Sequence, residues 1–112
     1  MELNKDNLEK WVGALESGKW EQTRGQLAEP GPGGELRLCA IGVGIAAMLK
    51  QKKKGVVEWR ILSHDEEFSK WLGTPCNLPL MWDETESCVV DVNDEHEQSF
   101  PMIAQLIRKQ YL

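Results

Sequence analysis

The side chain with the clearest chemical potential in this chain is the thiol of Cys39, which opens an uncharged run that continues to residue 49. Backbone N–H groups and the dipole at the start of a helix can lower the pKa of a thiol and make it a nucleophile. A base would come from His64 or His96, and Asn93 could orient either ring. These residue types predict, as one hypothesis, a cysteine-dependent hydrolase or transferase.

A structural role for Cys39 is the favoured interpretation. Cysteine is among the most buried residue types, and no sequence motif ties either histidine to this thiol. We therefore predict that Cys39 forms a wall of the core and that the chain has no catalytic residue.

The region from 71 to 107 is expected to form an electronegative surface, because it contains seven acids and no Lys or Arg. The acids are Asp83, Glu84, Glu86, Asp91, Asp94, Glu95 and Glu97. Such a surface favours a protein partner, and a net charge of −5 argues against binding to nucleic acid. The leading hypothesis is a non-catalytic protein-binding module that uses these acids. A third hypothesis, mimicry of nucleic acid, ranks below both because seven carboxylates make a small mimic.

Two short polar stretches superficially resemble ligand sites. Oxygen-bearing side chains at 91, 93, 95 and 97 suggest a calcium loop, but an EF-hand needs Gly and Glu where this chain has His96 and Met102. A solvated acidic turn is the favoured interpretation. The basic run Lys50 to Lys54 lacks aromatic neighbours for stacking and predicts a solvated helix end. No metal and no cofactor are predicted.

The cysteines and the apolar segments indicate the compartment. Cys39, Cys76 and Cys88 form no C-x-x-C pair, which favours three reduced thiols over one disulfide and a free thiol. The first residues lack the apolar segment of a signal peptide. The run 38–49 is shorter than the ~20 residues that span a bilayer. We expect a cytoplasmic protein with no membrane partner.

Apolar periodicity predicts the elements that must position these residues. Helices are expected at 6–17, from 63 to 72 with Ser63 and Glu66 as a capping box, and at 99–111 with Ser99 as the cap. The run 39–50 favours a buried helix over a buried strand, with Gly42 and Gly44 admitting another backbone. Extended segments are expected at 20–29, 35–38, 56–62 and 87–92, the first two joined by the loop 29–34.

These elements predict an α+β fold: three or four helices around a small antiparallel sheet, with a buried central helix near 39–50. At 112 residues the chain is expected to form one globular domain, 1–112. Trp20 and Trp82 lie outside the apolar faces and could anchor a partner, although core placement is the default.

Several short motifs, taken in order, resemble a family of small uncharacterised proteins of tailed bacteriophages and prophages. Members read W-x-x-A-L-x-S-G-x-Y-x-Q, then G-x-L, C-C-L-G-V and, near the end, L-N-D-x-G-x-S-F-x-x-I-A. The matching segments are Trp11 to Gln22, Gly25 to Leu27, Cys39 to Val43, Val92 to Asp94, and Ser99 to Ala104.

The resemblance implies a phage or prophage origin, an accessory role in an infected or lysogenic bacterial host, and no catalytic residues. Two departures matter. Ala40 stands where the family often has a second cysteine, which removes vicinal dithiol chemistry. Residues 95–98 replace a shorter glycine-containing turn.

Overall fold

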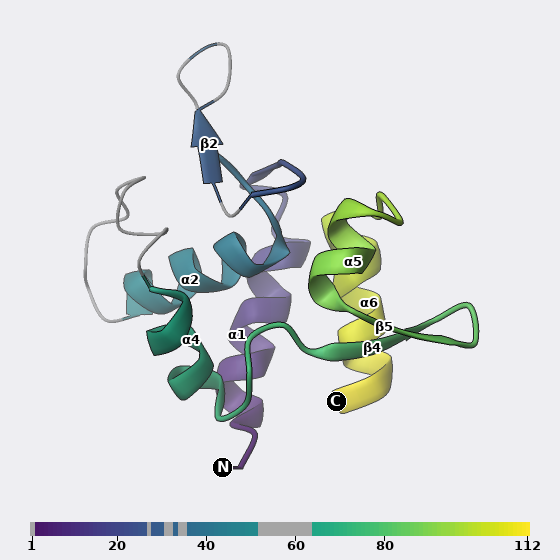
Figure 1. Cartoon of the computed structure of the whole chain (residues 1–112). Coiled ribbons are helices and arrows are strands. Elements are labelled where there is room, and N and C mark those ends of the chain that lie inside the picture. The colour runs from purple at the N-terminus through teal and green to yellow at the C-terminus, as the bar shows by residue number, and fades with distance from the viewer. Residues whose placement is uncertain (1, 27, 31–32, 34–35, 52–63) are drawn as a thin grey trace.

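The computed structural model describes residues 2–26, 28–30, 33, 36–51 and 64–112. These residues form an α+β fold, as predicted, with five helices and two small sheets (Figure 1). The helices are α1 (Lys5–Glu16), α2 (Ala40–Gln51), α4 (Asp65–Leu72), α5 (Val89–Asp94) and α6 (Phe100–Tyr111). The strands are β1 (Glu21–Gln22), β2 (Ala28–Pro30), β3 (Leu36–Leu38), β4 (Pro79–Trp82) and β5 (Thr85–Cys88).

The predicted buried central helix is confirmed. Every described side chain from Ala40 to Leu49 is buried except Ala47, which is partly exposed. Helix α2 packs against α1, α4 and α5, and the indole N–H of Trp11 donates to the carbonyl of Ala40 at 2.9 Å. The low-charge composition of this helix thus follows from its position between three other helices.

The three-stranded sheet is mixed rather than purely antiparallel. β2 and β3 pair antiparallel, with Glu29 opposite Arg37, as predicted for strands joined by the loop 29–34. β1 pairs parallel to β3 on its other edge, with Gln22 opposite Leu38. The extended segment expected at 20–29 is therefore two strands, which lie on opposite sides of β3.

The close approach at Gly44 differs from the prediction. The neighbour is the ring of Phe68 in α4 rather than another backbone, and a Cβ at residue 44 would lie within 3 Å of its Cε1 and Cε2 atoms. Phe68 also meets Trp11 edge-on, with ring centroids 5.1 Å apart. The glycine therefore makes room for a buried aromatic side chain at the crossing of α2 and α4.

The strand predicted at 87–92 is wrong beyond Cys88. Cys88 is extended and ends β5, and α5 begins at Val89. β-Branched residues favour strands, but Val89 and Val92 are fully buried three positions apart on one helix face. Their burial outweighs that local preference, and the acidic turn expected at 91–97 is helical as far as Asp94.

A projecting hairpin occupies residues 79–88, of which the sequence predicted only 87 and 88 as extended. β4 and β5 pair antiparallel around a two-residue turn, and Trp82 lies opposite Thr85. Figure 1 shows this hairpin extending beyond α6, on the side of the molecule away from α2 and α4. Asp83 and Glu84 occupy the turn with φ values of 48° and 65°. Such turns usually carry Asn-Gly, so Asp-Glu gave no hairpin signal.

The helix ends agree with most of the sequence predictions. Ser99 caps α6 by accepting from the N–H of Met102, and Gly73 ends α4 in a left-handed conformation. Asn4 caps α1, and its side chain accepts from the N–H of Asn7. The strand expected at 56–62, Ser63 of the capping box and the basic residues 52–54 lie outside the described residues.

Candidate functional site

Cys39 lies at the N-terminus of α2 and acts as its cap. Its carbonyl accepts from the N–H of Val43 at 3.0 Å, and its Sγ accepts from the N–H of Gly42 at 3.4 Å. Only 6% of the residue is exposed. The thiol therefore satisfies a helix-end donor inside the core, which is a structural task.

The surroundings of Cys39 favour the neutral thiol. Burial raises its pKa, and the nearby negative charge of Asp94 acts in the same direction, while the backbone N–H groups of Gly42 and Ile41 oppose the rise. The net shift is upward. A helix N-terminus lowers a thiol pKa only when the thiolate is not desolvated, and here desolvation dominates.

The two histidines lie elsewhere and have other partners. The Nδ1 atom of His64, which immediately precedes α4, pairs with a carboxylate oxygen of Glu67 in that helix. The ring of His96 stacks on Trp82, with centroids 5.3 Å apart. Across the described part of the chain, no hydrogen bond or ring contact joins Cys39 to either histidine. The contacts therefore do not assemble the Cys–His–Asn arrangement.

Of the residues in the Cys–His–Asn hypothesis, Asn93 is the one that lies beside Cys39. Both the oxygen and the nitrogen of its side-chain amide already have hydrogen-bond partners. Its Oδ1 accepts from the side chain of Gln22 at 2.8 Å and from the N–H of Ala40 at 3.2 Å. Its Nδ2 donates to the carbonyl of Thr23 at 3.0 Å and to Asp94 at 2.7 Å. Only 1% of Asn93 is exposed, so it joins α5, the end of β1 and the start of α2.

We expect Cys39 to be the least reactive of the three thiols, all of which are free. Alkylation of the folded protein, followed by peptide mass spectrometry, should label Cys76 and Cys88, which are half-buried, at least about tenfold faster at pH 7.5. Because the thiolate is the reactive form, a raised pKa moves the increase in Cys39 labelling to higher pH. Rapid labelling of Cys39 at neutral pH would contradict this assignment.

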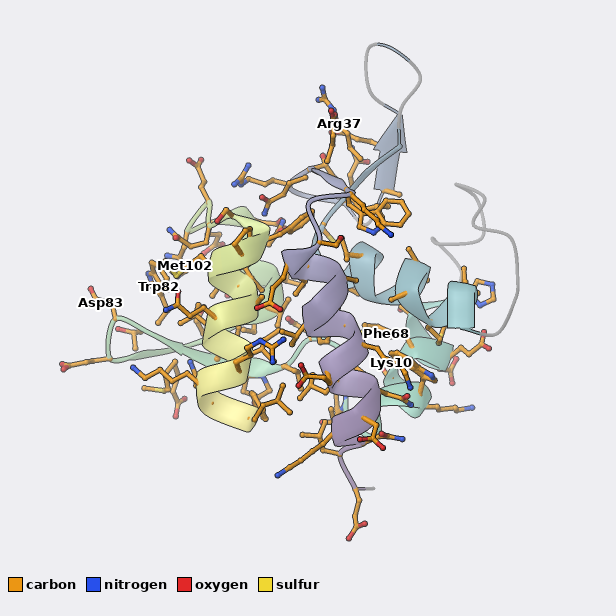
Figure 2. All side chains as sticks on the ribbon, turned by 180° about the vertical axis from the view of Figure 1, so that it is seen from behind. Lys10, Arg37, Phe68, Trp82, Asp83 and Met102 are labelled. Carbon is orange, nitrogen blue, oxygen red and sulfur yellow. The ribbon has the colours of Figure 1, made fainter. Side chains whose placement is uncertain are left out.

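The seven predicted acids separate into two groups. Asp83, Glu84 and Glu86 lie exposed on the β4–β5 hairpin, which we call the acidic hairpin. Figure 2 shows Asp83 at its tip, away from the helices. None of these three makes an ion pair with any residue that the structure describes.

The second group lies on α5 and in the turn that follows this helix. Asp91 and Asp94 are half-buried, and Glu95 and Glu97 are exposed. The guanidinium of Arg24 donates to the carbonyl of Glu97 at 2.9 Å and brings a positive charge to this turn. The sequence could not reveal this approach, because Arg24 is far from the turn along the chain. Arg24 thus approaches the second group, whereas no described Lys or Arg forms an ion pair with the acidic hairpin.

Arg108 of α6 pairs with carboxylates of α1 rather than with the acidic hairpin. Arg108 forms a two-point pair with Glu16, at 2.7 and 3.0 Å, and a third contact with Glu9 at 2.6 Å. These carboxylates raise the pKa of Arg108, and the pairing lowers that of Glu16. The charge of Arg108 is thus engaged by α1, and none of the described residues forms an ion pair with the hairpin carboxylates.

Other kinds of site were also sought. The described residues contain no group of three His, Cys, Asp or Glu side chains arranged to hold a metal ion, and none of the helices in that part of the chain could span a bilayer. Comparison with protein-family models, with curated proteins and with solved structures finds no match to this chain.

Proposed function

We propose that this chain is a phage-type accessory protein that binds a host or phage protein in the bacterial cytoplasm through its acidic hairpin. The observation that carries the proposal is the position of Asp83, Glu84 and Glu86 on a projecting hairpin without ion-pair partners among the described residues. Unpaired charges on a protruding element accelerate and orient association with an oppositely charged surface.

The conformation of the tip supports a binding role. Asp83 and Glu84 both have left-handed φ values, which cost non-glycine residues about 1 kcal/mol or more each. Glycine would form the same turn with less strain. The stability of the hairpin does not account for two carboxylates at this turn, and a use for their charge in binding does.

The phage assignment rests on the ordered motifs of the sequence. The segments from Trp11 to Gln22 and from Cys39 to Val43 belong to α1, β1 and α2, which form the body of the fold. The acidic hairpin lies outside those motifs. This division supports a body of the fold that is shared with the resembling family, and an acidic hairpin that serves separately to recognise the partner.

Charge reversal of the hairpin tests the proposal. The triple variant Asp83→Lys, Glu84→Lys and Glu86→Lys should reduce capture of the partner from a bacterial lysate by about tenfold, because opposite charges become like charges. Capture by the unchanged protein should weaken as salt is added, because salt screens the attraction between exposed charges.

A matched control separates local charge from total charge. The exposed residues Glu2, Asp65 and Glu66 lie on α4 and near the start of α1. Their triple change to Lys alters the net charge equally and should leave capture unchanged. Equal capture by both variants, with both folded by circular dichroism, would remove the support for the proposal.

A further inference from the structure

A groove of about 530 Å³ lies between the acidic hairpin and the end of α6. Met81 and Tyr111 supply apolar surface, and Glu86 and Gln110 supply polar groups, while Leu80 is buried beneath the groove with 1% of its surface exposed. This volume falls within the range of about 300–1,000 Å³ that is usual for ligand pockets. The groove can therefore receive one or more side chains of a partner.

Hydrogen bonds from α6 hold one wall of the groove in place. Gln110 accepts from the N–H of Met81 at 2.7 Å and donates to its carbonyl at 3.1 Å. The hydroxyl of Tyr111 donates to the carbonyl of Pro79. Because Gln110 satisfies the outer edge of β4 at Met81, this edge does not offer a site for an added strand. Recognition in the groove must use side chains.

The groove combines an apolar side chain with a carboxylate. Met81 is 47% exposed and lies directly opposite Glu86 across the hairpin, so both side chains lie on the same face. Methionine adapts to varied apolar partners. An apolar group entering beside Met81 would bring a neighbouring cation close to Glu86.

We infer that this groove binds a cationic amphipathic segment of the partner, with an apolar side chain against Met81 and a Lys or Arg on Glu86, an inference that rests on the proposed binding function. Asp83 and Glu84 at the tip extend the same negative charge along the hairpin. A second copy of this chain fits poorly, because two acidic hairpins would repel each other.

A synthetic peptide provides the test. A peptide of about 14 residues, with Leu on one helical face and Lys on the other, is titrated into isotope-labelled protein. The amide signals of Leu80, Met81, Glu86, Gln110 and Tyr111 should shift most. A peptide with Gln in place of Leu keeps the charge and should bind at least about tenfold more weakly.

Two methionine variants give a matched comparison. Met81→Ser should weaken binding of the Leu/Lys peptide by about five- to tenfold. Met102→Ser should have no effect, because Met102 is also exposed, at 37%, but does not line the groove. Glu86→Gln should weaken binding several-fold and reduce its dependence on salt.

The results separate this inference from the proposed function. Equal binding of the Leu and Gln peptides, or equal effects of the two methionine variants, would contradict binding of an apolar side chain in the groove. Either result would leave the proposal of charge-dependent partner capture untouched. Localised binding of the Leu/Lys peptide together with partner capture that survives hairpin charge reversal would support the groove and contradict the proposed function.

Discussion

Replacement of Asn93 by alanine is expected to lower the free energy of unfolding by about 3 kcal/mol. The substitution removes four hydrogen bonds made by a side chain that is 1% exposed. It leaves the N–H of Ala40 and the carbonyl of Thr23 without that partner in a buried region, and unsatisfied buried groups are costly. Urea denaturation followed by circular dichroism measures the change.

A second asparagine provides the control for this prediction. Asn77 is exposed and accepts one hydrogen bond, from the N–H of Val90 at the start of α5. Asn77→Ala should therefore cost about 1 kcal/mol or less. If the Asn93 and Asn77 variants were equally stable, the assignment of Asn93 as the central connection between α5, β1 and α2 would be wrong.

Gly44→Ala is expected to destabilise the protein by about 2–3 kcal/mol. The added methyl group would lie 2.7 and 2.8 Å from ring atoms of Phe68 and closer still to Cζ. Phe68 cannot move freely, because it packs against Trp11 and Trp71, with ring centroids 5.1 and 5.9 Å away. Thermal or chemical denaturation would show a stability loss without loss of the fold.

Two further variants make the Gly44 prediction specific. Gly13→Ala, on the exposed face of α1 with no atom within 4 Å of the new methyl group, should stabilise the protein by up to about 1 kcal/mol. Phe68→Leu should reduce the penalty of Gly44→Ala when the two are combined, because the clashing ring atoms are absent. Additive effects would contradict a direct contact between residue 44 and Phe68.

The sequence predicted the helical body of the fold well. The apolar stripes of α1 and α6 and the uncharged run of α2 are continuous over three turns, so local pattern and burial agree. The prediction of secondary structure failed where local sequence preference and burial disagree. The valines of α5 favour a strand locally, but three-dimensional packing makes them helical. The hairpin turn carries Asp83 and Glu84, which lack the usual turn signal.

The candidate site was predictable only in part. The acidic composition from 71 to 107 was visible in the sequence. Its division depends on contacts far apart along the chain: one part is a hairpin with no ion pair to a described residue, and the other is a turn near Arg24. The same is true of Asn93, whose partner Thr23 lies 70 positions away. Cys39 was correctly predicted as buried, and its role as the cap of α2 emerged from the structure.

The central claim is that this protein acts through its acidic hairpin and not through Cys39. The most direct test compares partner capture by two folded variants, Cys39→Ser and the triple reversal of Asp83, Glu84 and Glu86 to Lys. Serine can accept the same N–H at the start of α2, so the first variant should capture the partner fully, while the second should lose about nine-tenths of it. Loss of capture by Cys39→Ser, with retention by the hairpin variant, would contradict the claim.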